Sequence, residues 1–208
     1  VHHQLPLAHV GGFSILTRCL HARAAVVLME PAPFDPGRLI EAAEVQRVTL
    51  LSVVPTMLEQ LVRRSPPPSL RAALVGGAGA RPALIAAARA AGWPVLPTFG
   101  MSETSAQVCT QRLGDERTRG VGPPLPGVEV RIGADGQIEV SGPTLMDGYL
   151  GEPVLPEGSF FRTGDLGSLD GEGHLHVTGR ADDRIVSGGE NVDPLEVEVG
   201  YGLIPLVD

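Results

Sequence analysis

Short apolar runs alternate with segments of helical periodicity along the first hundred residues of the chain. Apolar stretches bounded by turn residues are typical of buried strands, and here they comprise Ala25–Met29, Thr49–Val54, Ala72–Val75 and Pro94–Pro97. Helices are predicted between them, at Gly12–Ala22, from Pro36 to Arg47 behind an Asp35 cap, at Thr56–Arg64 and at Pro82–Ala91. Strands that alternate with helices of this length predict an α/β subdomain with a parallel sheet over residues 1–119.

The pattern changes after about residue 120 to alternation with a period of two. Its strands and turns are predicted, in chain order, at Val128–Ile132, Ala134–Gly136, Gln137–Val140, Leu166–Leu169, Asp170–Gly173 and His174–Val177. His174 and His176 are expected on one side of the last strand, at the surface. The sequence therefore predicts a small antiparallel, β-barrel-like subdomain over residues 120–178, packed on the α/β subdomain.

Composition narrows the classes of function. A chain of 208 residues can bury a core without a disulfide or metal, and its two cysteines, Cys19 and Cys109, fit a reduced, cytoplasmic protein. The net charge of −8 and the scattered basic residues give little support to nucleic-acid binding. No stretch approaches the roughly 20 apolar residues of a membrane span. A homo-oligomer is left open, and the missing initial Met suggests that the chain begins inside a longer protein.

Three polar clusters carry most of the chemical signal: Thr98–Thr104, Phe161–Asp165 and Gly179–Asp182. In the first, Glu103 follows a predicted parallel strand, where a carboxylate suits Mg²⁺ and the hydroxyls of Ser102 and Thr104 can donate to phosphate oxygens. The alternative is that Ser-Glu-Thr only caps a following helix. In the second cluster, a tight glycine turn could present Asp165 to two ribose hydroxyls, although Gly-Asp is also an ordinary turn sequence.

Small residues follow the predicted strand Ala72–Val75. Gly76, Gly77 and Ala78 could let a flat base approach the backbone, but glycine-rich strand ends are common and this is not a dinucleotide-binding signature.

Together these clusters resemble the acyl-adenylate-forming superfamily, the AMP-dependent synthetases and ligases. The resemblance covers nearly all of the chain but only the middle of the family's usual length. It implies that a small-molecule carboxylate and ATP give acyl-AMP and pyrophosphate, after which the acyl group passes to CoA. ATP/AMP, Mg²⁺ and CoA are therefore the expected cofactors.

The resemblance also implies roles for individual residues. Glu103 would be the Mg²⁺ ligand and Ser102 or Thr104 the phosphate donor. Phe99, which stands where the family usually has Tyr, would form an aromatic wall near the adenine, next to Gly100. Ser102 stands where the family usually has Thr.

Further roles fall on the other clusters. Gly76, Gly77 and Ala78 would face the adenine, Asp165 would accept the ribose hydroxyls, and Arg180 would lie near the ribose. Asp182 would be the pivot of a hinge, so that residues 179–208 form the hinge and the start of a truncated, mobile α+β domain. Rotation about such a hinge separates adenylation from thioester formation.

The acyl group is expected near His9, in a segment that resembles the wall of the family's acyl pocket. A structural role for His9, or a metal site with His2 and His3, is the alternative. Ser105 and Gln107 could contact the substrate, although the polarity of a loop explains them equally well.

Leu5–Gly12, Ser102–Val108 and Ser187–Asn191 are most similar to the 2-succinylbenzoate:CoA ligases of menaquinone biosynthesis. The alternatives are a fatty-acyl or aryl-CoA ligase, or a non-catalytic nucleotide-binding remnant. Nothing in the chain matches the family's Ser/Thr/Gly-rich phosphate loop or its C-terminal catalytic Lys. We therefore expect the 208 residues alone not to release pyrophosphate at a useful rate.

Overall fold

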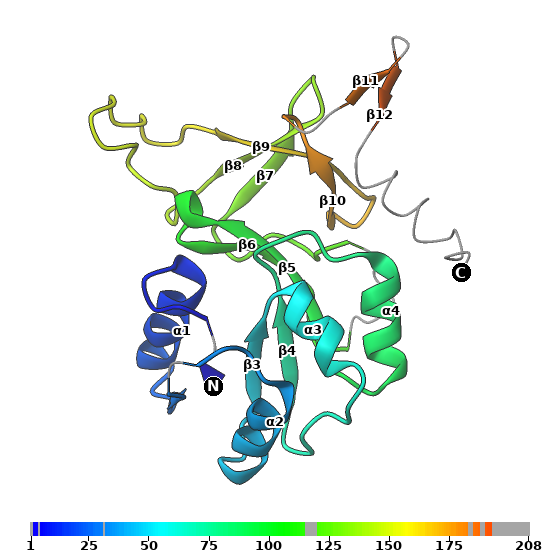
Figure 1. Ribbon diagram of the computed structural model, residues 1–208. Helices are drawn as coiled ribbons and strands as arrows, with labels where there is room; N and C mark the ends of the chain where they lie inside the picture. Colours follow the sequence, from blue (N-terminus) through cyan, green and yellow to red (C-terminus); the bar gives the residue numbers. More distant parts are fainter. Residues whose placement is uncertain are drawn as a thin grey trace.

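The computed structural model describes residues 2–3, 5–30, 32–114, 120–182, 185–187 and 190–192. A six-stranded sheet lies in the order β2-β1-β3-β4-β5-β6 (Figure 1). Its strands are parallel except for β6, which pairs antiparallel with β5. Their bounds are β1 His2–His3, β2 Val27–Leu28, β3 Leu50–Val53, β4 Ala72–Val75, β5 Val95–Met101 and β6 Ala106–Thr110.

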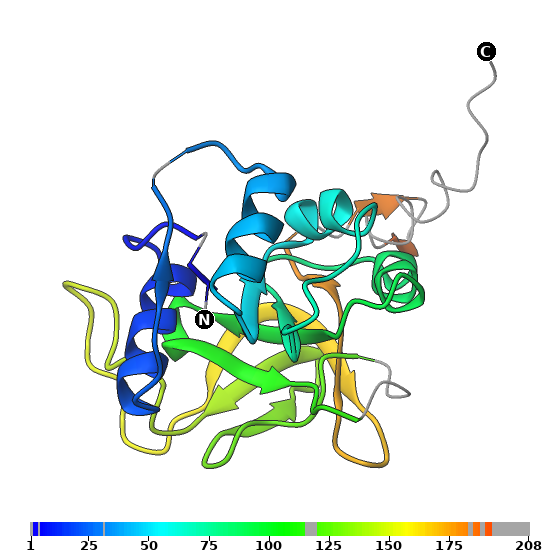
Figure 2. The same ribbon diagram turned by 90° about the horizontal axis from the view of Figure 1, so that it is seen from below.

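Four helices accompany this sheet: α1 Val10–His21, α2 Pro36–Val45, α3 Pro55–Leu61 and α4 Pro82–Ala90. A proline opens each of the last three, where its missing N–H costs nothing. The Asp35 carboxylate accepts hydrogen bonds from two backbone amides of the first turn of α2, as its predicted capping role requires. α2, α3 and α4 lie alongside β3, β4 and β5 (Figure 2). Their apolar side chains pack against these strands, around the fully buried Trp93.

Two predictions about this sheet were wrong in detail. The strand expected at Ala25–Met29 is only the two-residue β2, and Leu28 is 62% exposed, because β2 lies at the edge of the sheet rather than in its middle. β5 does not end at Pro97 but continues to Met101, because β6 provides hydrogen-bonding partners for the additional residues.

A second, antiparallel sheet has the order β10-β9-β8-β7. Its bounds are β7 Glu129–Ile132, β8 Gln137–Ser141, β9 Phe161–Leu169 and β10 Leu175–Arg180. Ile138, Val140 and Leu175 from this sheet pack with Val108 and Cys109 of β6, so a second core joins the two sheets. The fold class predicted from the sequence, a parallel α/β unit followed by an antiparallel β-barrel-like unit, is confirmed.

His174 does not lie at the surface as expected. It is only 9% exposed, and its backbone amide is bonded to the Asp170 side chain. Residues 120–122 run alongside the start of β10, with Val121 donating to the carbonyl of Leu175, and cover this region. His176 remains partly exposed.

Beyond β10, the two short strands β11 Ile185–Ser187 and β12 Glu190–Val192 pair antiparallel. Gly188 and Gly189 of the Ser-Gly-Gly-Glu-Asn motif, Asp183 and Arg184 of the predicted hinge, and residues 193–208 lie outside the described residues. The start of the mobile α+β domain therefore stays a prediction. Within the described ranges, no helix has the length and apolar character needed to cross a membrane.

Candidate functional site

Glu103 occupies the turn between β5 and β6. Ser102–Thr104 form a single 3₁₀ turn, after which Ser105 and Ala106 adopt positive φ angles of 53° and 103° and the chain enters β6. No helix follows this turn, so the alternative that Ser-Glu-Thr caps one was wrong. Gly100 is required by the hairpin, because a Cβ there would lie 1.6 Å from the carbonyl oxygen of Ala106.

The two candidate phosphate donors differ in accessibility. Thr104 is fully buried, and its hydroxyl bonds both the amide and the carbonyl of Met101 at 3.2 Å. Its role is therefore to hold the turn together. Ser102 is exposed beside Glu103, which leaves its hydroxyl accessible to a ligand.

Glu103 is held by the loop that connects β8 to β9. The Tyr149 hydroxyl donates to Oε1 of Glu103 at 2.9 Å, and the Met146 amide donates to its carbonyl oxygen at 2.8 Å. The hydrogen bond to Glu103 raises the pKa of the Tyr149 phenol. The second carboxylate oxygen, Oε2, has no hydrogen-bond partner among the described residues.

This environment fits Mg²⁺, the ion that the sequence resemblance implies. Mg²⁺ keeps several waters and is usually held by one or two carboxylates together with substrate phosphates, so one accessible carboxylate oxygen is an adequate protein contribution. Among the described residues there is no group of three or more His, Cys, Asp or Glu side chains arranged to hold a metal on their own.

Asp165 lies within β9, not in the tight turn that its sequence suggested. Glu139 and Gln137 of β8 pair with Arg162 and Leu166, so three residues of β9 bulge opposite one residue of β8. Gly164 sits in this bulge with a φ of 76°, a conformation that other residues rarely adopt. Directly after the bulge, Asp165 pairs with Arg180 at the end of β10.

Arg180, at the end of β10, lies against this bulge. Its Nη1 atom is 3.6 Å from Oδ1 of Asp165 and donates to the carbonyl oxygen of Thr163 at 3.4 Å, while its Nη2 atom is 3.1 Å from Oδ2 of Asp182. Gly164 makes room for it, since a Cβ there would lie 3.2 Å from Nη2. Arg180 thus joins the predicted ribose residue to the predicted hinge residue.

The electrostatics connect Asp165 to Glu103. Burial raises the pKa of the Asp165 carboxyl, and the charge of Arg180 opposes that shift. The negative charges of Asp182 and Glu103 also raise this pKa, so these groups share one electrostatic environment. Side chains from β9, β10 and the β5–β6 turn, far apart in sequence, therefore lie within electrostatic reach of one another, and their part in binding a nucleotide stays a prediction.

The predicted adenine loop lies at the carboxyl end of β4. A Cβ on Gly76 would lie 2.3 Å from the Thr98 hydroxyl, which explains why this position has no side chain. Gly77 has a φ of 82°, and both Gly77 and Ala78 are exposed. Phe99, on the neighbouring β5, is half-buried and packs on the second core. Its contact with adenine stays a prediction.

The predicted substrate residues lie on α1 and the β5–β6 hairpin. His9 caps α1, with Nδ1 accepting a hydrogen bond from the Gly11 amide at 3.3 Å, so its structural alternative has direct support. Ser105 is exposed at the start of the hairpin's second strand. Gln107 accepts a hydrogen bond from Arg18 and donates to Thr110. The side chains of His2 and His3 lie outside the described residues.

Arg18 and Tyr149 were missed by the sequence reasoning. Arg18 is half-buried, and burial lowers its pKa, yet no described carboxylate pairs with it. The sequence did distinguish Arg18, because it is the only Lys, Arg, Asp or Glu in the segment that forms α1. Tyr149 had no comparable signal, since its contact with Glu103 spans 46 positions through an irregular loop.

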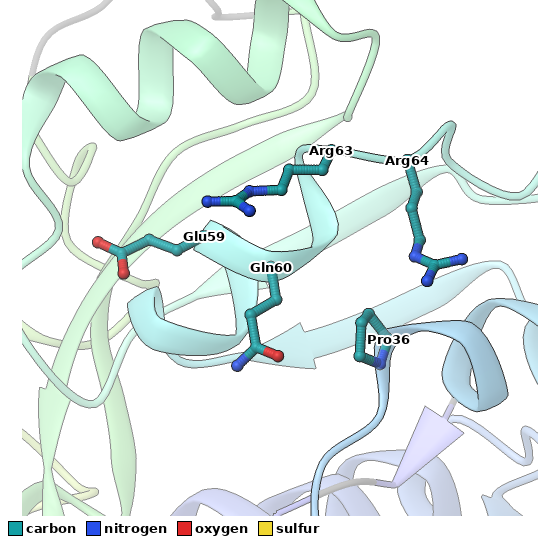
Figure 3. Close-up of a pocket in the computed structure, with 5 residues that line it drawn as sticks. All are labelled: Pro36, Glu59, Gln60, Arg63 and Arg64. Atoms are coloured by element: carbon teal, nitrogen blue, oxygen red, sulfur yellow. The ribbon is translucent and has the colours of Figure 1, made fainter.

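A surface groove elsewhere involves none of the predicted site residues. It lies between the start of α2 and the end of α3 (Figure 3) and is lined by Pro36, Glu59, Gln60, Arg63 and Arg64. None of the motif residues lines this groove, so the chemistry expected around Glu103 and Asp165 stays a prediction that the groove does not bear on.

Residues 1–150 match the family described as AMP-binding enzyme. The chain belongs to this family. The AMP-binding enzyme assignment confirms the resemblance that the three polar clusters suggested.

Individual members of the AMP-binding family are closely similar to the chain. It is 38% identical over 201 residues to 2-succinylbenzoate–CoA ligase of Lactococcus lactis subsp. lactis, with 93% of the chain and 44% of that protein covered. The o-succinylbenzoate CoA synthetase of Bacillus subtilis, solved with the acyl-adenylate intermediate OSB-AMP, superposes with a TM-score of 0.89 at 34% identity, over 99% of the chain and 46% of that structure.

The same Bacillus subtilis protein has been solved with ATP and a magnesium ion. That structure superposes with a TM-score of 0.87 at 34% identity, over 100% of the chain and 47% of its own length. The chain therefore spans less than half the length of the relatives it matches.

Proposed function

We propose that the chain is part of an AMP-forming acid:CoA ligase, whose carboxylate substrate reacts with ATP to give acyl-AMP and pyrophosphate before the acyl group passes to CoA. The carboxylate oxygen attacks the α-phosphorus, the bond to pyrophosphate breaks, and in the second step the CoA sulfur displaces AMP from the acyl carbon. Membership of the AMP-binding family and similarity to ligases of this class support the proposal.

The observation that carries the proposal is the pair of Asp165 and Arg180, 3.6 Å apart, whose carboxylate lies within electrostatic reach of Glu103. Asp165 would accept hydrogen bonds from the ribose hydroxyls, with Arg180 fixing its orientation. Glu103 would hold Mg²⁺, which when bound offsets the negative charge of the phosphates. Ser102 would donate to a phosphate oxygen, and the small residues of Gly76–Ala78 would leave space for the adenine.

A substrate with two carboxylates fits the surroundings of Gln107. One carboxylate must react with ATP, and a second needs a compensating charge if it is to leave water. Arg18 provides such a charge next to Gln107, which pairs with Gly100 on the hairpin that carries Glu103. We therefore favour 2-succinylbenzoate, the substrate named for the relatives, over a fatty acid, whose tail would gain nothing from Arg18.

If the substrate is 2-succinylbenzoate, the enzyme would belong to menaquinone biosynthesis. A cytoplasmic location also belongs to the proposal, and the buried free thiols of Cys19 and Cys109 are compatible with it. A homo-oligomer and the division of the chain at residues 119 and 178 stay predictions. The role of Asp182 as a hinge pivot also stays a prediction.

Equilibrium binding of non-hydrolysable acyl-sulfamoyl adenosines tests the proposal with the chain as it stands. We expect the 2-succinylbenzoyl analogue to bind at least about tenfold more tightly than the benzoyl or the fatty-acyl analogue, a difference of about 1.4 kcal/mol. Equal affinities would contradict the assigned carboxylate and leave an AMP-binding remnant or a ligase of other specificity. Failure to bind AMP or any analogue would contradict the nucleotide site.

A further inference from the structure

The loop between β8 and β9 makes hydrogen bonds to both the backbone and the side chain of Glu103. The Met146 amide donates to the Glu103 carbonyl oxygen, and three residues later the Tyr149 hydroxyl donates to Glu103 Oε1. Two contacts from one short stretch fix both the position and the rotamer of the carboxylate. The loop connects β8 and β9 of the antiparallel sheet, and Glu103 lies in the turn between β5 and β6 of the first sheet, so these contacts link the two sheets.

The loop has a defined conformation of its own around Tyr149. The Leu155 amide bonds to the Asp147 carbonyl oxygen at 2.6 Å, and the Glu152 amide bonds to the Tyr149 carbonyl oxygen at 3.0 Å. Gly148 adopts a φ of 149°, and a Cβ there would lie 3.1 Å from the Pro153 carbonyl oxygen. The backbone therefore presents Tyr149 to Glu103 through a turn that requires glycine.

The neighbour of Tyr149 shows that the loop does not bury every large side chain. Leu150 is fully exposed, whereas Tyr149 directs its hydroxyl to one oxygen of Glu103 while half of its surface stays in solvent. An exposed phenol adds little to a hydrophobic core, so the contact with the carboxylate is the distinguishing feature of this side chain.

We propose that Tyr149 is a positioning residue for the metal ion: by occupying Oε1 of Glu103 it directs Oε2 toward Mg²⁺. This inference rests on the proposed function, in which Glu103 is the Mg²⁺ ligand. A hydrogen bond from a neighbouring side chain orients a ligating carboxylate, and loss of such a partner typically weakens metal binding about 10–100-fold. Tyr149 holds Glu103 in one orientation before the ion arrives, so less orientational freedom is lost on binding.

Equilibrium binding of Mn²⁺, followed by electron paramagnetic resonance in the presence of saturating ATP, tests this role without requiring turnover. In Tyr149→Phe, which removes only the hydroxyl, we expect the affinity for Mn²⁺ to fall at least about tenfold. ATP affinity without metal should be unchanged. Leu150→Ala, in the same loop, is the matched control and should bind Mn²⁺ like the wild type.

Glu103→Gln separates this inference from the function on which it rests. We expect Glu103→Gln to lose Mn²⁺ binding and Tyr149→Phe to have no further effect in that background. If Glu103→Gln loses the metal but Tyr149→Phe retains wild-type affinity, the role of Tyr149 is refuted and the proposed function stands. Tighter Mn²⁺ binding by Tyr149→Phe would refute it too, because the hydroxyl would then compete with the ion. Retention of Mn²⁺ by Glu103→Gln would refute both assignments.

Discussion

Asp165 and Arg180 approach each other from neighbouring strands, with Oδ1 of the carboxylate 3.6 Å from Nη1 of the guanidinium. The pair forms where β9 bulges at Gly164, and Arg180 extends beyond it to Asp182. This relationship makes Asp165 a half-buried carboxylate held in one orientation by a cation. Such a carboxylate can accept two hydrogen bonds from a ribose without first having to become ordered.

Replacement of Asp165 by Asn should therefore weaken AMP binding about tenfold or more, because hydrogen bonds to a charged group contribute about 1.5–3 kcal/mol. Isothermal titration calorimetry of the chain with AMP would measure the effect. Asp135→Asn is the matched control, since Asp135, in the turn between β7 and β8 of the same sheet, also pairs with an arginine, Arg162. Equal affinity of Asp165→Asn and wild type would remove Asp165 from the ribose site.

Arg18 should determine which acyl group binds while leaving the nucleotide unaffected. In Arg18→Gln we expect the 2-succinylbenzoyl-sulfamoyl adenosine to bind roughly 10–100-fold more weakly, because its second carboxylate loses a charged partner. Affinity for AMP itself should stay unchanged. Competition binding against a fluorescent adenosine ligand would measure both affinities, with Arg81→Gln, an exposed arginine paired to Glu59, as the control. A parallel loss of AMP affinity would point to a disturbed fold instead of a substrate contact.

The features predicted from sequence are those that depend on neighbouring residues. β4 has the predicted bounds Ala72–Val75, because four apolar residues between turns suffice to define a buried strand. The cap of α2 by Asp35 involves residues only two and three positions away. Glu103 and Asp165 were recognised from short motifs, and the structure places both in one electrostatic environment.

The features that escaped prediction depend on pairing across long stretches of chain. The bulge at Gly164 exists because one residue of β8 lies opposite three residues of β9. The sequence of Phe161–Asp165 alone does not indicate this register. Arg18 and Gln107 are 89 positions apart. The exposure of β2 likewise follows from its place at the sheet edge, since the apolar sequence of Ala25–Met29 is equally compatible with an interior strand.

Packing of the predicted adenine loop against Thr98 should require glycine at position 76. Gly76→Ala would put a Cβ 2.3 Å from the Thr98 hydroxyl, so we expect the free energy of unfolding to fall by about 1–3 kcal/mol and AMP affinity to fall with it. Thr98→Ala removes the atom responsible, since the next contacts of that Cβ are at 3.4 Å or more.

The double variant Gly76→Ala/Thr98→Ala should therefore recover much of both properties. Urea denaturation and AMP titration of the wild type, the two single variants and the double variant form a complete thermodynamic cycle. Additive losses in that cycle would show that the clash with Thr98 is not the cause.

The turn between β9 and β10 should contribute to stability in a pH-dependent way. The pKa of Asp170 is lowered from its ordinary 3.8 to about 2, first by its hydrogen bond to His176 and then by the backbone amide of His174. A carboxyl whose pKa is depressed in the folded state stabilises the protein above its unfolded pKa, and that contribution is lost as the pH falls through the folded value. The wild type should therefore lose this contribution between about pH 4 and pH 2.

Asp170→Asn should be less stable than the wild type at neutral pH, with the difference shrinking over this acid range. Urea denaturation of both proteins at a series of pH values would measure it, and a difference that does not change below pH 4 would exclude ionisation of Asp170 as the cause.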